Sequence, residues 1–518
     1  MQSGVTGGAR ARPMRAGLDL CDLTAAQFAL LFAAFFIVAA VPVLAVETVP
    51  LFDYPNHLAR MHILAQDGRS AIVGRFYTAE WRPIPNLAMD LVVPLLSRVM
   101  PLALAGKSFL LAIFLLIAGG TAALHRVLFG RWSAWSLLAF LLLYNRILLW
   151  GFVNFLFGVG LLLFALTSWI GLHDRAMWQR LAIATGFACA LYLAHLFAFA
   201  VYALVVLGYE LARLRQQRRL FTGAALAELC ASSSQFIPAL AVMALAGGTG
   251  GAGEIGWSRL VRKLDILFNI VDNYRPWFDI ATFALLVAIF VAGTLHRKLA
   301  MSRVMMPPLL LLCLAQLAMP NRLFGGTGVD HRMPLILALL LVAASSMVLR
   351  NLRRQSILVA LVALLFLVRI AVITATWLGY DRVYAPIVAA LAALPPGSRL
   401  AVAPPTASVH ISRKEPPMTH LAALAVVTSD AFVPTLFAFP GQQPLAFREP
   451  YGALARTASP DDFWSLVADG AANPRAAAAL ADYDFVLVTG NPPQGPDAGL
   501  ALVLRASFPQ AKLFAVRH

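Results

Sequence analysis

Long apolar runs alternate with short polar segments from residue 27 to residue 378. Most runs hold about 20 residues, enough for a helix to cross a hydrocarbon core of about 30 Å. The runs predict spanning helices at residues 27–46, 103–124, 133–148, 153–171, 222–246, 279–296, 304–320, 333–349 and 356–378. The pattern therefore predicts an α-helical polytopic membrane protein. The first run is longer than the apolar part of a signal peptide, so we interpret it as an uncleaved helix.

Residues 181–210 form one more apolar stretch, interrupted by His195. Basic clusters flank this stretch, and clusters that all face the cytoplasm must be separated by an even number of crossings. Two short helices that turn near His195 satisfy this rule. One long tilted helix is the alternative. It would place the C-terminal region in the cytoplasm or require one basic cluster to face outward. The clusters are Arg10/Arg12/Arg15, Arg126/Arg131, Arg175/Arg180, Arg213/Arg215/Arg218/Arg219, Arg297/Lys298/Arg303 and Arg350/Arg353/Arg354.

Two helices in that stretch bring the expected total to about eleven spans, with a cytoplasmic N-terminal segment 1–26. The membrane domain is then 27–378, and its outward polar stretches are 47–102, 144–154, 247–278 and 321–332. The first outward loop, 47–102, is too long to be a simple turn. Polar residues therefore collect on one side of the membrane, which is where we expect function.

Residues 379–518 differ in character from the rest. Short apolar segments at 399–404 and 484–490 predict buried strands, residues 460–470 and 473–484 predict helices, and 511–518 predicts a closing strand. This pattern indicates a small α/β domain on the outer side. It contains no glycine-rich phosphate loop and no nucleophile elbow.

Composition agrees with a membrane protein, because 60% of residues are hydrophobic, 13% are charged and the mean hydropathy is +0.76. The net charge of +16 does not indicate nucleic-acid binding. From Gly379 onward ten basic residues balance ten acidic ones, so the excess lies in the basic clusters between spans. Cys21, Cys189, Cys230 and Cys313 form no disulfide or zinc-binding pattern.

The first candidate site is the stretch LFDYPNHLARMHIL, residues 51–64, directly after the first span. A carboxylate at headgroup level is partly desolvated, so Asp53 has a raised pKa and suits a general base. In a helix after Pro55, His57 and Arg60 lie about a turn away. We therefore predict His57 as a second catalytic residue and Arg60 as a ligand of a phosphate. The alternative is a solvated loop. The sequence indicates no definite cofactor. A divalent metal near Asp53 and His57 stays open, although no ligand set with convincing spacing is present.

The second candidate site is the outward stretch NRLFGGTGVDHRM, residues 321–333. Arg322 and Arg332 match phosphate oxygens through their guanidinium forks, and Asp330 and His331 lie beside them. The alternative is that these arginines anchor the chain at lipid headgroups.

A third candidate is Arg369, which lies inside the last predicted span. An intramembrane arginine costs about 2.5–3.5 kcal/mol on insertion scales, so it pairs with another group, faces a polar cavity or contacts a lipid phosphate. Snorkelling to the interface is the alternative. For His195 we predict a turn-capping role ahead of a catalytic one.

A first helix entering from the cytoplasm, a long outward loop with an early aspartate, about ten more spans and an outer α/β domain resemble the GT-C superfamily. These membrane glycosyltransferases use polyprenyl-phosphate-linked sugars. The resemblance implies that Asp53 is the base that activates the acceptor, while basic residues among Arg60, Arg322, Arg332 and Arg369 hold the departing phosphate. Tyr54 follows Asp53 where many relatives have a glutamate.

The resemblance implies a bacterial inner-membrane enzyme with a periplasmic C-terminal domain. It would transfer a sugar from a polyprenyl phosphate to an envelope glycan, lipid or protein, and its partners would include membrane lipids and no nucleic acid. Two alternatives are a lipid or solute transporter or flippase, and a catalytically inactive scaffold of the same fold. Transporters usually place ionisable groups at the midplane, whereas these spans carry few charges besides Arg369.

Overall fold

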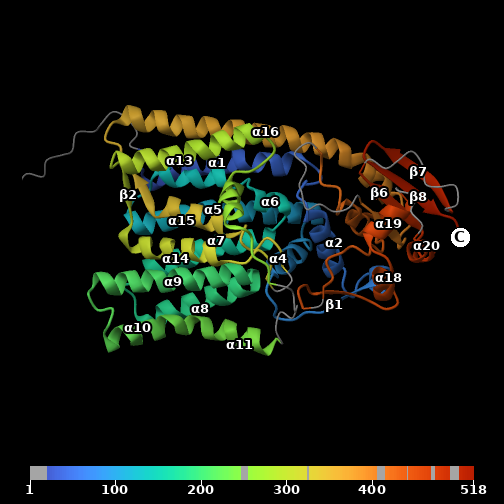
Figure 1. Cartoon of the computed structure of the whole chain (residues 1–518), viewed down its shortest axis with the longest axis horizontal. Helices are drawn as coiled ribbons and strands as arrows, with labels where there is room; N and C mark the ends of the chain where they lie inside the picture. The colour runs from blue at the N-terminus through green and yellow to red at the C-terminus, as the bar shows by residue number, and fades with distance from the viewer. Residues whose placement is uncertain are drawn as a thin grey trace, which may run out of the picture.

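The computed structural model describes residues 20–246, 255–323, 326–404, 415–439, 441–467, 473–490 and 501–518. The first arginine cluster and most of the predicted segment 1–26 lie outside these residues. The described helices of the bundle run side by side along the longest axis of the molecule (Figure 1). Among the described residues, seven helical segments are long and apolar enough to cross a membrane: Ala25–Ala45, Leu102–Phe129, Val153–Gly171, Leu196–Gln216, Gly223–Leu245, Pro276–Leu295 and Leu352–Ala392.

The elements of the bundle have the following bounds. Its principal helices are α1 Ala25–Ala45, α5 Leu102–Phe129, α7 Val153–Gly171, α8 Met177–Ala194, α9 Leu196–Gln216, α10 Gly223–Ser233, α11 Ile237–Leu245, α13 Pro276–Leu295, α14 Met306–Ala318, α15 Met333–Ala343 and α16 Leu352–Ala392. Shorter elements between them are α2 Tyr54–Ala65, α3 Val73–Phe76, β1 Tyr77–Ala79, α4 Ala88–Leu96, η1 Ala134–Leu142, α6 Arg146–Trp150, η2 Ser234–Phe236, α12 Leu260–Asp265, η3 Ile266–Ile270, β2 Leu299–Met301, η4 Arg303–Met305 and β3 Ser345–Met347.

The predicted break near His195 is present. The backbone of His195 is extended between α8 and α9, and its Nδ1 accepts a hydrogen bond from the backbone N–H of Phe197. His195 therefore caps α9, as the sequence predicted, because the first N–H groups of a helix lack partners inside it.

Several predicted spans are not continuous α-helices. The span 222–246 is divided into α10, η2 and α11, and the span 304–320 begins in η4. Residues 133–148 form the 3-10 helix η1 and then, after Asn145, the short α6. The predicted span 333–349 stops being helical at Ala343, and the chain continues as β3, which pairs antiparallel with β2. We attribute the end of the helix to hydrogen bonds of Ser345. Its hydroxyl donates to the carbonyl of Leu341 and accepts from the indole N–H of Trp135.

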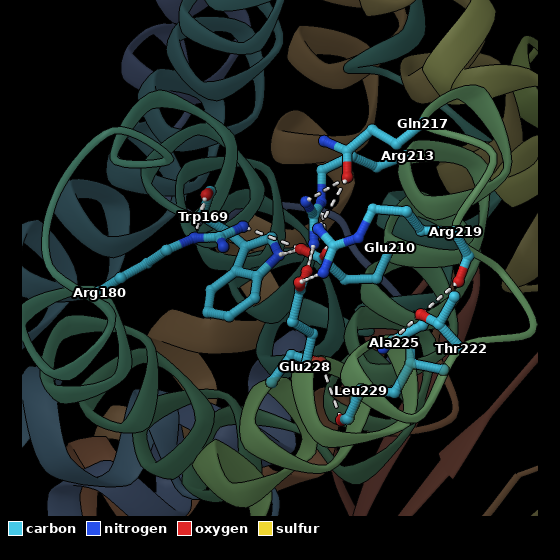
Figure 2. A network of polar contacts seen from close by, with 11 residues as sticks. Trp169, Arg180, Glu210, Arg213, Gln217, Arg219, Thr222, Ala225, Glu228 and Leu229 are labelled. Atoms are coloured by element: carbon cyan, nitrogen blue, oxygen red, sulfur yellow. Dashed lines mark hydrogen bonds and ion pairs between the residues drawn. The ribbon is translucent and has the colours of Figure 1, made fainter.

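An ion network ties four helices together at the end of α9 remote from His195 (Figure 2). Glu210 on α9 accepts hydrogen bonds from Trp169 of α7, Arg180 of α8 and Arg213. Glu228 on α10 binds Arg213 and Arg219, and the Arg180 guanidinium stacks 3.5 Å from the centre of the Trp169 ring. Three arginines of the predicted cytoplasmic clusters thus share two glutamates, Glu210 and Glu228.

The C-terminal region consists of β4 Leu400–Ala403, η5 Leu421–Ala423, α17 Leu424–Ser429, β5 Leu445–Phe447, α18 Tyr451–Thr457, α19 Pro460–Val467, α20 Pro474–Leu480, β6 Phe485–Thr489, β7 Leu502–Phe508 and β8 Ala511–Val516. Its sheet has the order β4-β6-β8-β7, parallel between β4 and β6 and antiparallel elsewhere. The predicted strands and helices are confirmed among the described residues, and residues 468–470 of the predicted helix 460–470 lie outside them. Strand β7 was missed, because its exposed face interrupts the apolar pattern with Arg505 and Ser507.

The first outward loop and the C-terminal region lie at the same end of the bundle and fold together (Figure 1). Strand β1 of the loop pairs antiparallel with β5, with Tyr77 opposite Phe447. Helix α2 packs on α17, and His62 contacts the Asp430 carboxylate at 2.7 Å. Helix α16 also continues without a break past the predicted boundary at residue 379 to Ala392.

Candidate functional site

Asp53 is held against the end of α6. The backbone N–H groups of Phe52 and Asp53 donate to the carbonyls of Leu149 and Trp150, at 2.9 and 3.1 Å. Gly151 makes this approach possible, because a Cβ added there would lie 2.9 Å from the Asp53 backbone nitrogen. Gly151 also has a φ of +88°, a conformation that favours glycine.

The Asp53 carboxyl lies just before the first residue of α2 and is mostly buried, with 16% of its side chain exposed. Burial raises the pKa of Asp53 to about 7, while the positive charge of Arg60 acts in the opposite direction. A carboxyl with this pKa is half ionised near neutral pH, which suits a general base.

His57 is buried one turn into α2, and its Nε2 lies 3.2 Å from the carbonyl of Gly151. Burial and the charge of Arg60 lower the pKa of His57 well below its usual value, so the ring is neutral. Since the carbonyl can only accept, Nε2 carries the hydrogen. The buried Nδ1 has no hydrogen-bond partner among the described residues and is left as a free acceptor.

Asp53 and His57 line a cavity of about 190 Å³, which we call the Asp53 cavity. Its other walls come from the segment before α4, the α6–α7 turn and the start of α7, the α8–α9 junction, the loop before α15 and the C-terminal region. The polar members from these walls are Asn86, Asn154, His195, Arg332, Gln442 and Gln443. Residues far apart in the sequence therefore meet around one carboxyl group.

Arg332 is the cation of the Asp53 cavity. It has no ion-pair partner among the described residues, and its buried Nε has no hydrogen-bond partner there. Its guanidinium lies 4.7 Å from the centre of the Phe152 ring. Burial lowers the pKa of Arg332 to about 10, against the opposing charge of Asp330, so the side chain stays cationic at neutral pH. A half-buried cation in this state favours an anionic ligand.

A second, larger cavity of about 820 Å³ adjoins the first. The two share Asn86, His195, Arg332 and Gln442. Apolar residues of α9 and α11 supply most of its other walls, among them Phe197, Phe199, Leu240 and Met243. We call it the apolar cavity. Arg332 and His195 therefore stand at the border between a polar compartment and an apolar one.

Arg60 was predicted to bind phosphate, and the structure places it in a different contact. It is fully buried and forms a two-pronged ion pair with Asp90 of α4, at 2.6 and 3.0 Å. Arg60 is not among the described residues that line the Asp53 cavity. Arg60 therefore joins α2 to α4 and acts on Asp53 through its charge.

The other predicted site residues of the 321–332 loop, Arg322, Asp330 and His331, do not line the Asp53 cavity. Arg322 is exposed and runs along Gly256. Asp330 is buried, accepts from Asn321 at 2.8 Å and lies 3.5 Å from Lys263. The His331 ring packs against Trp150 in a tilted arrangement, and His331 is hydrogen-bonded to Asn269. Of the predicted pair of phosphate-binding arginines in this loop, Arg332 alone enters the cavity.

Arg369 pairs with a carboxylate and does not snorkel. Its guanidinium donates to Asp279 of α13 at 2.8 Å and to the carbonyl of Val271 at 2.8 Å. The side chain is 3% exposed, so it has no access to a lipid phosphate in this arrangement. Arg146 is occupied in the same way by Asp272.

Sequence reasoning missed the contribution of the C-terminal region to the site. His420 lies with its Nε2 3.5 Å from Asp53 Oδ1, and Phe437 and Gln443 line the Asp53 cavity. The sequence pattern of this region gave no signal, because His420 is a single histidine that belongs to no recognisable motif. Within the described residues, no group of three or more histidine, cysteine or acidic side chains is placed to hold a metal ion.

The site thus combines a proton acceptor, a neutral histidine with a free acceptor atom and an unpaired arginine, next to a large apolar space. A scan against models of known protein families finds no match to the chain, and a search of curated proteins finds no similar sequence.

Proposed function

We propose that the protein is a membrane glycosyltransferase that moves a sugar from a polyprenyl-phosphate donor to an acceptor hydroxyl. The supporting observation is that Asp53, with a pKa near 7, and the unpaired Arg332 line one cavity. The apolar cavity beside Arg332 has the character needed for the first isoprene units of a lipid tail. The GT-C resemblance of the sequence leads to the same proposal.

In the proposed reaction the Asp53 carboxylate takes the proton of the acceptor hydroxyl. The acceptor oxygen attacks the anomeric carbon, and the bond from that carbon to the phosphate oxygen breaks with its electron pair. The polyprenyl phosphate leaves as an anion beside Arg332, whose charge stabilises it in a water-poor site. His57 Nδ1 orients the acceptor by accepting a second hydroxyl hydrogen.

The proposal includes the finer topology. Seven long spans, the three shorter apolar segments at Ala134–Trp150, Arg303–Ala318 and Met333–Ala343, and α8 give eleven crossings. With a cytoplasmic N-terminus, the site and the C-terminal region then face the periplasm of a bacterial inner membrane, where acceptors of the cell envelope are found.

The test is transfer of radiolabelled sugar from synthetic polyprenyl-phosphate sugars by protein reconstituted in nanodiscs. Asp53→Asn should lower kcat by about 10²–10⁴-fold, as expected for loss of a general base, with the protein still folded. Arg332→Met should lower kcat by about 10²-fold, as for loss of one donor to a developing anion. Arg322→Met is the matched control and should transfer normally, because its side chain lies outside both cavities.

The same variants separate the alternatives. A scaffold would keep its cellular phenotype with Asn at position 53. A flippase would move the intact lipid-linked sugar between leaflets without releasing polyprenyl phosphate. Either result would overturn the proposal.

A further inference from the structure

His420 and Asp53 face each other across the junction between the C-terminal region and the first outward loop. His420 lies just before η5, and its ring contacts Phe52 and Phe437 edge-on, with centres 5.2 and 5.1 Å away. Its Nε2 lies 3.5 Å from Asp53 Oδ1. This is slightly long for a hydrogen bond, as contacts in unliganded active sites often are.

Asn56 fixes which nitrogen of His420 carries the hydrogen. The Asn56 side-chain oxygen accepts from the backbone N–H of Phe437 at 2.9 Å, which sets the orientation of the amide. The amide nitrogen then donates to the carbonyl of Thr435 at 2.9 Å and to His420 Nδ1 at 3.3 Å. Since Nδ1 is an acceptor, the neutral ring carries its hydrogen on Nε2, toward Asp53.

The ring is neutral because burial lowers the pKa of His420 to about 4. The other titratable groups around Asp53, among the described residues, are His57 and Arg60 on α2, and Arg332 and His195 across the cavity. His420 differs from these groups, because its Nε2–H donor lies 3.5 Å from Asp53 Oδ1.

We infer that His420 is the positioning residue of the proposed base: it holds one oxygen of Asp53 through Nε2–H and leaves the other oxygen for the acceptor hydroxyl. The catalytic meaning of this inference rests on the proposed function. It makes the C-terminal region a part of the active site. The base is complete only while that region is docked on α2.

The test is an infrared pH titration of the purified full-length protein in nanodiscs, without substrate. The carbonyl band of protonated Asp53 is identified as the band absent from Asp53→Asn. It should titrate near pH 7. A neutral donor stabilises the charged carboxylate, so removing it raises the midpoint, by up to about one pH unit.

Two amides that differ by one methylene make the comparison sharp. His420→Gln places an N–H near the position of Nε2 and should keep the midpoint near that of the unaltered protein. His420→Asn is too short to reach Asp53 and should raise the midpoint, as should His420→Phe, which keeps the ring volume. His62→Phe is the matched control, because His62 joins the same two parts of the chain through Asp430 but is not placed at Asp53.

An unchanged midpoint in both His420→Asn and His420→Phe would overturn the inference. So would an equal shift in His62→Phe, because docking of the C-terminal region would then be the cause. A failure of the proposed function gives a different result. Asp53→Asn would then keep transferring sugar, while the His420 variants would still show the raised Asp53 midpoint. Conversely, Asp53→Asn could lose transfer while the Asp53 midpoint stays unchanged in the His420 variants. That result would remove only the role of His420.

Discussion

At the scale of single residues, whether an arginine near the site is free to bind a ligand depends on pairing with a carboxylate distant in the sequence. Arg60 meets Asp90, Arg146 meets Asp272 and Arg369 meets Asp279, whereas Arg332 meets none among the described residues. Sequence position could indicate Asp53 as a candidate base, because a carboxylate next to a span is unusual. It could not indicate which arginines stay free, since that depends on long-range pairing.

The raised pKa of Asp53 predicts a pH-dependent stability. A carboxyl whose pKa is higher in the folded than in the unfolded state stabilises the fold at low pH, and this contribution is lost as pH rises through about 7. Asp53→Asn should therefore melt at a higher temperature than the unaltered protein at pH 8. The difference should shrink as the pH falls to 5, measured by thermal unfolding in nanodiscs. A constant difference would contradict the raised pKa.

The same ionisation predicts the pH profile of transfer. Because the base acts as a carboxylate, kcat should fall about tenfold per pH unit below pH 7 and level off above it. A steady-state profile between pH 5 and 9 measures this limb. A flat profile down to pH 5 would exclude Asp53 as the base.

The buried pair of Arg369 and Asp279 predicts a large one-sided effect. Asp279→Leu leaves a buried guanidinium without its partner and should cost about 3–5 kcal/mol of unfolding free energy. The double variant with Arg369→Leu should recover most of this loss, as measured by denaturant unfolding. Asp484→Leu is the control, since its pair with Arg399 is about one-third exposed and should matter far less.

At the scale of elements, the helices were predictable wherever apolar periodicity and charge parity agreed. The requirement for an even number of crossings between basic clusters indicated the break at His195. The apolar pattern of residues 181–210 alone would have predicted one continuous helix. The pattern failed at η1 and at the end of α15, because an apolar run does not distinguish a 3-10 helix or a short strand from an α-helix. Hydrogen bonds of Asn145 and Ser345 decide those segments.

The turn after α6 predicts a strict requirement for glycine. Gly151→Ala adds a Cβ 2.9 Å from the Asp53 backbone and should displace the base, with a loss of transfer of at least about tenfold. Gly130→Ala is the matched control. Gly130 has a similar φ of +72°, but an added Cβ there meets nothing within 4 Å, so it should lose stability and keep kcat. Equal kcat in the two variants would show that the close approach is unimportant.

At the scale of the whole molecule, the site and the Glu210 network lie at opposite ends of α9. The 21 residues of α9 span about 32 Å, close to one hydrocarbon thickness. The sequence predicted that polar chemistry gathers on one side. It did not predict that the C-terminal region closes the site, because contacts such as β1 with β5 leave no local pattern.

This arrangement predicts the sidedness of labelling. In a variant without the native cysteines, Arg69→Cys and Ser507→Cys should react with a membrane-impermeant maleimide from the same side, because β1 pairs with β5. Arg218→Cys, just beyond the far end of α9, should react from the opposite side. Labelling of all three from one side would refute the proposed topology.

The pairing of β1 with β5 also has a consequence for biogenesis. Residues 77–79 emerge from the ribosome long before residues 445–447, and almost all of the membrane helices are made in between. In the proposed topology the first loop is therefore translocated early and lacks its β5 partner until synthesis is nearly finished. A chain released early would insert its spans but would lack the C-terminal region that brings His420 to Asp53. Incomplete products should therefore show no sugar transfer.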